Sequence, residues 1–258
     1  MDVFASTVNS FGGVVVDPKS LPAESEGFRH GLSHCLEQWT TEGLKVVWLE
    51  VPISRAPLIP IAVEMGFVFH HSTQDYLMLT YRLADGAFIP PYATHYIGAG
   101  GVVLNDKGEL LVVTEKFLRG DRPHYYKLPG GALHPGEHIV DGVIREILEE
   151  TGVQTRFESL ICFRHWHGYR FGKSDIYFVC RLSPLTTEIV IDEQEIDVSM
   201  WMPVEQYLAS ESVGVFNKRI VQAALECSSL VTVQIEGYQG DPHAREIFMP
   251  ACLDLSTL

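Results

Sequence analysis

The chain has 258 residues, 46% of them hydrophobic, and its formal net charge at pH 7 is −14. This length holds one large domain or two modest ones, with enough apolar residues for a core in each. The negative charge argues against a general nucleic-acid-binding surface. No run of about 18 uncharged apolar residues occurs, which argues against a membrane span.

The N-terminus and the cysteines predict a cytoplasmic protein. The first twenty residues contain Asp2 and no basic start before an apolar run, unlike a secretory signal. The five cysteines are odd in number and scattered, and no C-x-x-C pair suggests zinc or redox chemistry. A reducing intracellular compartment fits this composition best.

Residues 1–92 are expected to form a small α/β domain. In chain order, the hydrophobic pattern predicts a strand over 11–17, a helix within 22–41, a strand over 45–52, a helix over 56–65, and strands over 67–71 and 76–83. Residues 84–93 contain Gly86, Pro90 and Pro91 and form the best candidate for a linker.

Residues 93–258 are expected to form a second α/β domain, because strands and helices alternate there. Two strands form a predicted hairpin around Asn105–Gly108. Further elements are predicted as strands over 156–166 and 174–184 and as helices near 203–210 and 217–226.

A helix ending at Gly152 carries an acidic cluster at its C-terminal end. Glu146, Glu149 and Glu150 lie three and four residues apart and therefore share a face. Each carboxylate near the negative end of the helix dipole costs about 0.3–1 kcal/mol. A hard divalent cation such as Mg²⁺ would offset that cost, and Gly142, one turn earlier, would leave bare backbone open to a ligand.

An apolar stripe on the same helix is expected to face the core. Its members are Val140, Val143, Ile144, Ile147 and Leu148.

Residues 131–153 fit a longer pattern: Gly, five residues, Glu, seven residues, then Arg-Glu-apolar-any-Glu-Glu-any-Gly-apolar. The matched positions are Gly131, Glu137, Arg145, Glu146, Ile147, Glu149, Glu150, Gly152 and Val153. This pattern is the Nudix box, and the chain resembles the Nudix hydrolases. The resemblance implies an α/β/α sandwich with a mixed sheet, and a pyrophosphohydrolase that uses Mg²⁺, with Mn²⁺ as an alternative ion.

The sequence blocks WLEVPISRAPLIPIAVEMGFVFHH, YKLPGG and FGKSDIYFVCRL are similar to one two-domain subgroup. It includes the fibroblast-growth-factor-antisense Nudix proteins of animals and the plant Nudix enzymes that hydrolyse ADP-ribose and NADH. The resemblance covers about residues 10–210. It implies a pre-Nudix first domain with an acetyltransferase-like (GNAT-like) fold, and makes ADP-ribose or NADH the first substrate guess.

The same resemblance assigns roles to residues of the box. Glu149 and Glu150 match metal ligands, and Glu146 matches either a ligand or the general base. The carbonyl of Gly130 matches a further metal ligand. Arg145 and Glu137 match an ion pair that fixes the loop of the box.

Two acidic residues after the box are candidates for an additional catalytic carboxylate. Glu193 and Glu195 precede Trp201, and Glu195 has the spacing to that tryptophan that is usual in the family. The alternative is an ordinary glutamate of a surface loop.

Cations are needed because a phosphate substrate must approach an acidic protein. Lys116, Arg119, Arg122 and Lys127 precede the box. Arg164, Arg170 and Lys173 follow it in a stretch rich in aromatic residues, where cations hold phosphates and rings stack a base. Lys127, Arg164, Arg170 and Lys173 are the predicted substrate-binding residues.

Other functions use the same motif or the first domain. Inositol pyrophosphates, dinucleoside polyphosphates and capped RNA are alternative substrates, and a partner-binding regulatory protein with weak activity is an alternative class. Acetyl transfer is rejected, because no glycine-rich turn follows the strand at 45–52. The first domain is instead expected to form a homodimer or to cover the substrate pocket.

Overall fold

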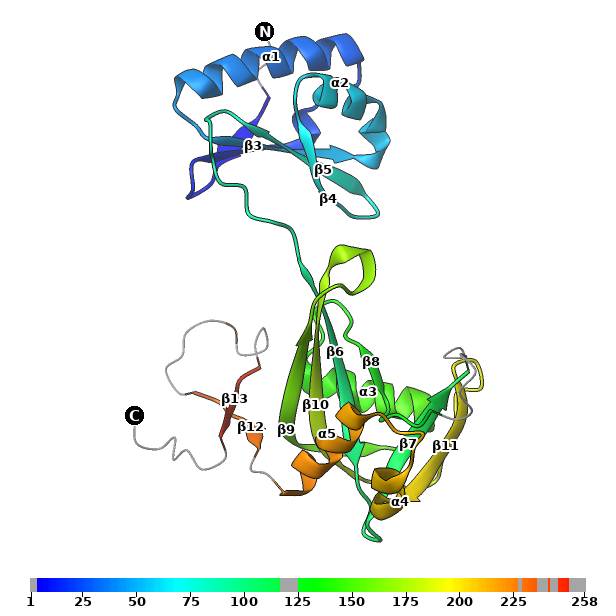
Figure 1. Ribbon diagram of the computed structural model, residues 1–258. Coiled ribbons are helices and arrows are strands. Elements are labelled where there is room, and N and C mark those ends of the chain that lie inside the picture. The colour runs from blue at the N-terminus through cyan, green and yellow to red at the C-terminus, as the bar shows by residue number, and fades with distance from the viewer. Residues whose placement is uncertain (1–3, 117–124, 227–228, 236–240, 242–245, 251–258) are drawn as a thin grey trace. The chain divides into compact units, whose positions relative to one another are not determined.

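The structure is a computed structural model that describes residues 4–116, 125–226, 229–235, 241 and 246–250. The chain divides into two compact units, Met1–Thr94 and His95–Leu258 (Figure 1). Each unit is described by itself.

The first unit is built on a five-stranded sheet with the order β1-β2-β3-β5-β4. Strands β2 and β3 are parallel, and the other neighbours are antiparallel. The strands are β1 (Ser6–Val8), β2 (Gly13–Val16), β3 (Val46–Pro52), β4 (Val68–Ser72) and β5 (Tyr76–Arg82). The helices are η1 (Pro18–Ser20), α1 (Ser25–Thr41), η2 (Ile53–Leu58) and α2 (Ile59–Glu64).

Helices α1 and α2 cover one face of this sheet (Figure 1). Strand β3 alternates, so that Val47 and Leu49 are buried in the core below the helices. Trp48 lies between them in the strand and therefore projects from the opposite face. Helix α1 completes this core with buried side chains at helical spacing, namely Phe28, Leu32, Cys35 and Trp39.

The predicted elements of this unit all occur, with two differences. Strand β1 was not predicted, because its three residues are too short to show a period. The helix expected over 56–65 begins as the irregular 3-10 segment η2, which contains Pro57, and becomes α-helical only at Ile59. A proline inside a helix removes a hydrogen bond and breaks the regular turn.

The second unit contains a mixed six-stranded sheet with the order β13-β12-β9-β10-β6-β8, and a two-stranded sheet of β11 and β7. Its strands are β6 (His95–Val103), β7 (Glu109–Glu115), β8 (Gly130–Ala132), β9 (Thr155–Trp166), β10 (Ser174–Pro184), β11 (Ile196–Pro203), β12 (Leu230–Thr232) and β13 (Phe248–Pro250). Its helices are α3 (Ile139–Thr151), η3 (Arg170–Gly172), α4 (Val204–Ala209) and α5 (Val215–Glu226).

Helices pack on both sides of these strands. Val143 and Ile147 of α3 pack with Val103 of β6 in one core cluster. Ile220 and Val221 of α5 pack in a second cluster that contains the next residue back along β6, Val102. The unit is therefore an α/β fold with helical layers on either side of mixed strands.

The predicted hairpin at Asn105–Gly108 forms its turn, but its strands separate. The Asn105 side chain accepts hydrogen bonds from the amides of Lys107 and Glu109, at 2.9 and 3.0 Å. Strand β6 then pairs with β10 and β8, whereas β7 pairs with β11. Five consecutive residues of β7, from Leu110 to Thr114, are buried, so β7 is covered on both faces. Beside the turn, one antiparallel bridge joins Leu104 and Leu110.

The sequence argued against a membrane span and against cysteine-based zinc or redox chemistry. Within them, no helix combines the length and apolar character needed to cross a membrane. Cys35, Cys162 and Cys180 are free thiols, whereas Cys227 and Cys252 lie outside the described residues.

Candidate active site

Helix α3 carries the box, and both of its ends are capped. At the C-terminus, Gly152 adopts φ 72°, a left-handed conformation, and its amide donates to the carbonyl of Leu148, which confirms the predicted cap. At the N-terminus, the carboxylate of Glu246 accepts hydrogen bonds from the amides of Ile139 and Val140, at 2.9 and 3.3 Å. A residue of the chain's tail, to which the sequence assigned no role, therefore places negative charge at the positive end of the dipole.

The apolar stripe of α3 is narrower than predicted. Val143 and Ile147 are buried, but Leu148 is 44% exposed because it lies at the edge of the face that packs on the sheet. The prediction for Gly142 was wrong as well. A Cβ there would lie 3.1 Å from a Glu137 oxygen and 3.2 Å from the side chain of Leu133. The missing side chain therefore makes room for the loop before the helix, and leaves no open backbone for a ligand.

Arg145 and Glu137 clamp that loop. The guanidinium of Arg145 donates to both carboxylate oxygens of Glu137, at 2.7 and 2.9 Å, and to the carbonyl of Ala132 at 3.1 Å. Glu137 also accepts from the amide of His134, at 2.8 Å. The hydrogen bonds from Arg145 are the main reason that the pKa of Glu137 falls to about 2, against the opposing effect of burial. The loop is thus tied to the middle of α3 by a charged pair with several hydrogen bonds.

The acidic cluster does not converge in the way that the helix geometry suggested. Arg145 also donates to Glu146 at 3.0 Å and to Glu149 at 2.8 Å. Glu149 points toward solvent, with 57% of its side chain exposed, whereas Glu150 is only 8% exposed. Among the described residues, no three His, Cys, Asp or Glu side chains are grouped closely enough to hold a metal ion. Arg145 pairs with Glu146 and Glu149, and Lys127 pairs with Glu150.

Glu150 has the least favourable position for a charge. Its carboxylate accepts from the amide of Gly130 at 2.8 Å and lies 3.5 Å from the ammonium of Lys127. Burial raises the pKa of Glu150 to about 7, with smaller upward contributions from Glu146 and Glu115, although Lys127 and the Gly130 amide oppose the shift. Burial also raises the pKa of Glu146. Perturbed carboxyl groups of this kind are typical of functional sites.

Gly130 is required by its backbone conformation. Its φ is 144°, and a Cβ would lie 2.4 Å from the carbonyl oxygen of Ala99. It would also lie 2.7 Å from the hydroxyl of Tyr177, whose pKa is raised by burial and by Glu150 and Glu146. Only glycine fits this conformation beside Ala99 and Tyr177, and its amide donates to the buried carboxylate of Glu150.

Glu115, at the end of β7, belongs to this group of charges and was missed from the sequence. It forms an ion pair with Lys127, which lies between Glu115 and Glu150. The one available signal was an acidic residue directly after the buried run of β7. Its partner Lys127 could not be inferred, because the backbone bridge from Lys127 to Val113 depends on tertiary pairing.

Glu195 lies beside this group through strand pairing. It directly precedes β11, whose first residue, Ile196, is paired with Glu115. Its carbonyl accepts from the amide of Lys116 at 2.9 Å, and its side chain is exposed. The carbonyl of Glu193 accepts from the ammonium of Lys116.

The predicted substrate-binding cations are not all together. Lys127 lies among the carboxylates, and Arg164 is cross-strand from Tyr177, with its guanidinium 2.6 Å from Asp175. Arg170 and Lys173 belong to the turn between β9 and β10. Lys173 directly precedes β10 and is four residues from Tyr177, about 13 Å along an extended chain. Arg119 and Arg122 lie outside the described residues.

Comparison with known proteins places this geometry in a family. Residues 94–224 match the family model described as "NUDIX domain", and residues 4–83 match one described as "Nudix hydrolase domain". The chain belongs to the Nudix hydrolases, enzymes that hydrolyse a pyrophosphate linkage in nucleoside diphosphate derivatives.

Plant and animal relatives support the assignment. The chain is 41% identical over 235 residues to Nudix hydrolase 2 of Arabidopsis thaliana, covering 90% of this chain and 84% of that protein. It is 41% identical over 202 residues to Nudix hydrolase 8 of the same plant, covering 78% of this chain but only 55% of the longer relative. It is 33% identical over 225 residues to "Nucleoside diphosphate-linked moiety X motif 6" of Homo sapiens, with coverages of 84% and 71%.

Proposed function

We propose that this chain is a Mg²⁺-dependent pyrophosphohydrolase for a nucleoside diphosphate derivative, with ADP-ribose or NADH as the first candidate substrates. The observation that supports a reactive site most strongly is geometric: the buried carboxylate of Glu150 lies 2.8 Å from the amide of Gly130 and 3.5 Å from the ammonium of Lys127. The choice of substrate rests on the resemblance to the two-domain subgroup.

The donor chemistry of the site fits a hard divalent ion. Glu146, Glu149 and Glu150 offer carboxylate oxygens, and Gly130 lies against Glu150 with a carbonyl as a further oxygen donor. Their negative charge is now compensated by Arg145 and Lys127. We propose that these four residues bind Mg²⁺, or Mn²⁺ in its place, and that their ion pairs loosen when they do. When bound, such an ion neutralises diphosphate oxygens and lowers the pKa of a water molecule.

The remaining residues deprotonate the attacking water and hold the loop of the box. A water attacks one phosphorus, the phosphorus–oxygen anhydride bond breaks, and a phosphate ester leaves. Either Glu146 or Glu195 accepts the proton of that water, while Arg145 and Glu137 hold the loop in place.

The two candidates for the general base are separable by mutation. If Glu195 is the base, Glu195→Gln lowers turnover and leaves the response to Mg²⁺ intact. If Glu146 is the base, Glu195→Gln retains wild-type turnover, because the exposed side chain of Glu195 then has no chemical part.

We propose that the phosphates of the substrate contact Lys127, Arg164, Arg170 and Lys173. Arg164 supports this role because its guanidinium lies 5.4 Å from the ring of Trp166, so a cation and an aromatic face occur together. Replacing Arg164 with Gln should therefore raise KM more than it lowers kcat.

For the first unit, we propose a GNAT-like pre-Nudix domain over residues 1–92, with the Nudix domain over 93–258, in a cytoplasmic homodimer. Exposed apolar side chains on the edge strand β4, Val68 and Phe69, at 53% and 65%, support self-association. Sedimentation of the full chain tests it: a dimer that Phe69→Asp converts to a monomer supports the proposal, and a wild-type monomer contradicts it.

The function is tested by release of phosphate esters from a substrate panel with Mg²⁺. The panel holds ADP-ribose, NADH, a dinucleoside polyphosphate, capped RNA and an inositol pyrophosphate. Wild type is compared with Glu149→Gln and with Glu188→Gln, a control that removes one charge from an exposed loop. Turnover of ADP-ribose or NADH that only Glu149→Gln loses supports the proposal. Turnover of another panel member would identify a different substrate. No phosphate-ester release from any member by any of the three proteins would contradict the proposal that the chain is an enzyme.

A further inference from the structure

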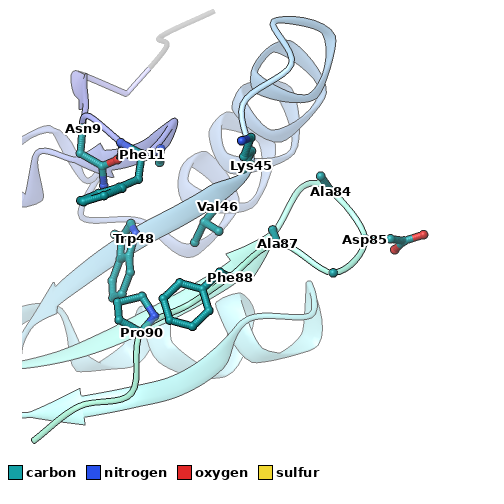
Figure 2. A pocket seen from close by; sticks show the side chains of 12 residues that line it. Asn9, Phe11, Lys45, Val46, Trp48, Ala84, Asp85, Ala87, Phe88 and Pro90 are labelled. Carbon is teal, nitrogen blue, oxygen red and sulfur yellow. Dashed lines mark hydrogen bonds between the residues drawn. The ribbon is translucent and has the colours of Figure 1, made fainter.

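The first unit contains a pocket of about 760 Å³ whose lining residues all belong to that unit (Figure 2). Sites for small molecules usually have volumes of about 300–1,000 Å³. The proposed hydrolase activity uses none of these residues, so the pocket needs an explanation of its own.

The pocket is formed on the face of the sheet that α1 and α2 leave uncovered. Trp48 and Val46 of β3 line its base. The turn between β1 and β2 supplies one wall with Asn9 and Phe11, and residues 84–90 supply the other. Figure 2 shows Phe11, Trp48, Phe88 and Pro90 gathered on one side, while the carboxylate of Asp85 points away from them.

Hydrogen bonds hold the wall at 84–90 in place. Arg82 donates from Nε to the carbonyl of Ala87 at 3.0 Å. A ring nitrogen of His70 lies 2.7 Å from the carbonyl of Pro90. The amide of Leu83 donates to the carbonyl of Lys45 at 2.9 Å. The wall is therefore anchored near both ends, which makes the pocket a formed site.

Two N–H donors meet at Gly13. The side-chain oxygen of Asn9 accepts from the amides of Phe11 and Gly13, at 3.0 and 2.9 Å, which orients its amide group. A Cβ at Gly13 would lie 2.8 Å from Nδ2 of Asn9 and 3.2 Å from Nε1 of Trp48. Neither nitrogen donates to another residue in the part of the chain that the structure describes. Two adjacent donors are thus free to bind acceptor atoms of a ligand.

The aromatic side chains favour a flat ligand. Phe11 is 84% exposed and Phe88 is 78% exposed, although both line a pocket. Exposing such rings to water is unfavourable, and a planar ring system would cover them by stacking. Aromatic faces together with directed N–H donors are suited to a heteroaromatic ring that carries acceptor nitrogens or oxygens.

The charge in the pocket favours an anion. Lys45 lines the pocket, and within the described ranges it forms no ion pair with a carboxylate. Since Asp85 points away, the ammonium group is the available charge for a ligand.

We propose that this pocket binds a planar heteroaromatic ligand that carries an anionic group, the chemistry of a nucleotide. The ring stacks on Phe11, Trp48 and Phe88, its acceptors bind Asn9 and Trp48, and its anionic group pairs with Lys45. This site is additional to the one for pyrophosphate hydrolysis, and its ligand need not be a substrate.

Calorimetric titration of the full-length chain tests the proposal, with AMP, adenosine and inorganic phosphate as probes. A chelator removes divalent ions, so that binding is measured without turnover. AMP should bind at one site, and Phe88→Ala should weaken its Kd by about tenfold, because one stacking contact is lost. Ile53→Ala removes an apolar side chain that is 69% exposed and lies outside the pocket, and it should leave the Kd unchanged. Arg164→Gln, which removes a proposed phosphate contact of the hydrolytic site, should leave it unchanged too, which separates the two sites.

A second variant tests the charge. Lys45→Gln should lower the affinity for AMP to that of adenosine and should not change the affinity for adenosine. Lys19→Gln, an exposed lysine side chain of η1, is the matched control. No binding of AMP by the wild type, or binding that survives both Phe88→Ala and Lys45→Gln, would overturn the proposal. A Phe88→Ala protein that changes only its oligomeric state would overturn it as well.

Discussion

The two ends of the box place the same residue type in opposite environments. In the loop before α3, Glu137 accepts hydrogen bonds from Arg145 and His134, and its pKa falls to about 2. In the last turn of α3, Glu150 is buried and its pKa rises to about 7. The fold stabilises the anionic form of Glu137, whereas burial destabilises the anionic form of Glu150.

The difference between Glu137 and Glu150 distinguishes a structural residue from a proposed reactive one within the same motif. The clamp of Glu137 and Arg145 gains from ionisation at neutral pH, so folding alone accounts for it. Folding alone does not account for Glu150, which would be more favourable as an uncharged residue. Sites that carry out reactions commonly retain such unfavourable groups. This difference supports the proposal that the loop is architectural and that the last turn of α3 carries the chemistry.

The largest expected effect is on turnover. Glu149→Gln should lower kcat by about 10²-fold or more, since loss of even an outer partner of a metal site costs about 10–100-fold. The fold should survive, because Arg145 keeps both hydrogen bonds to Glu137, and the amide oxygen that Glu149→Gln introduces can still accept from Arg145. Steady-state kinetics on the substrate found in the panel measure this, with Glu188→Gln as the control. If Glu149→Gln kept the wild-type kcat, the last turn of α3 would have no special part in the reaction.

The second effect is a dependence of stability on pH. Because the pKa of Glu150 rises from 4.5 to about 7 on folding, the folded state binds more protons in this interval. The metal-free wild type should therefore lose stability as pH rises from 4.5 to 7, by on the order of 2–3 kcal/mol.

Glu150→Gln should remove this loss. The free energy of unfolding, measured in urea at several pH values with a chelator present, should show a gap between wild type and variant that widens in favour of the variant as pH rises. A gap independent of pH would show that Glu150 has an ordinary pKa.

The third effect is on the clamp. Glu137→Gln should lower the free energy of unfolding by about 2 kcal/mol, less than a fully buried pair would, because Arg145 keeps Glu146 and Glu149 as partners. Since Glu137 has a depressed pKa, its contribution is present above the ordinary value of 4.5 and disappears as pH falls toward about 2. Urea unfolding at pH 7 and at pH 2.5 checks both statements, and an equal difference between the two proteins at both pH values would contradict them.

The smallest effect is at the start of the helix. Glu246→Ala should destabilise the protein by about 1 kcal/mol, because the amides of Ile139 and Val140 lose their acceptor. Thermal unfolding measures this, with Glu211→Ala in an exposed loop as the control. Equal midpoints for the two variants would show that the cap contributes nothing.

The sequence predicted what depends on neighbours along the chain. The spacing of residues in 131–153 predicted helix α3 and its cap at Gly152. It also placed Glu137 and Arg145 in one motif. The spacing did not predict that Glu149 is exposed and Glu150 buried. Residues that share a helix face can lie at its solvent-exposed edge or at its buried centre. Contacts such as Glu115 with Lys127, or Glu246 with the start of α3, depend on strand pairing far away in sequence.

The most direct test of the account is the thermal midpoint in a titration with Mg²⁺. Binding to the folded state stabilises it by about 2.7 kcal/mol at a hundred times the Kd. We predict a rising midpoint for the wild type and for Glu188→Gln, and a weaker rise for Glu149→Gln and Glu150→Gln. An equal rise in all four proteins would contradict the assignment of the last turn of α3 to metal binding and catalysis.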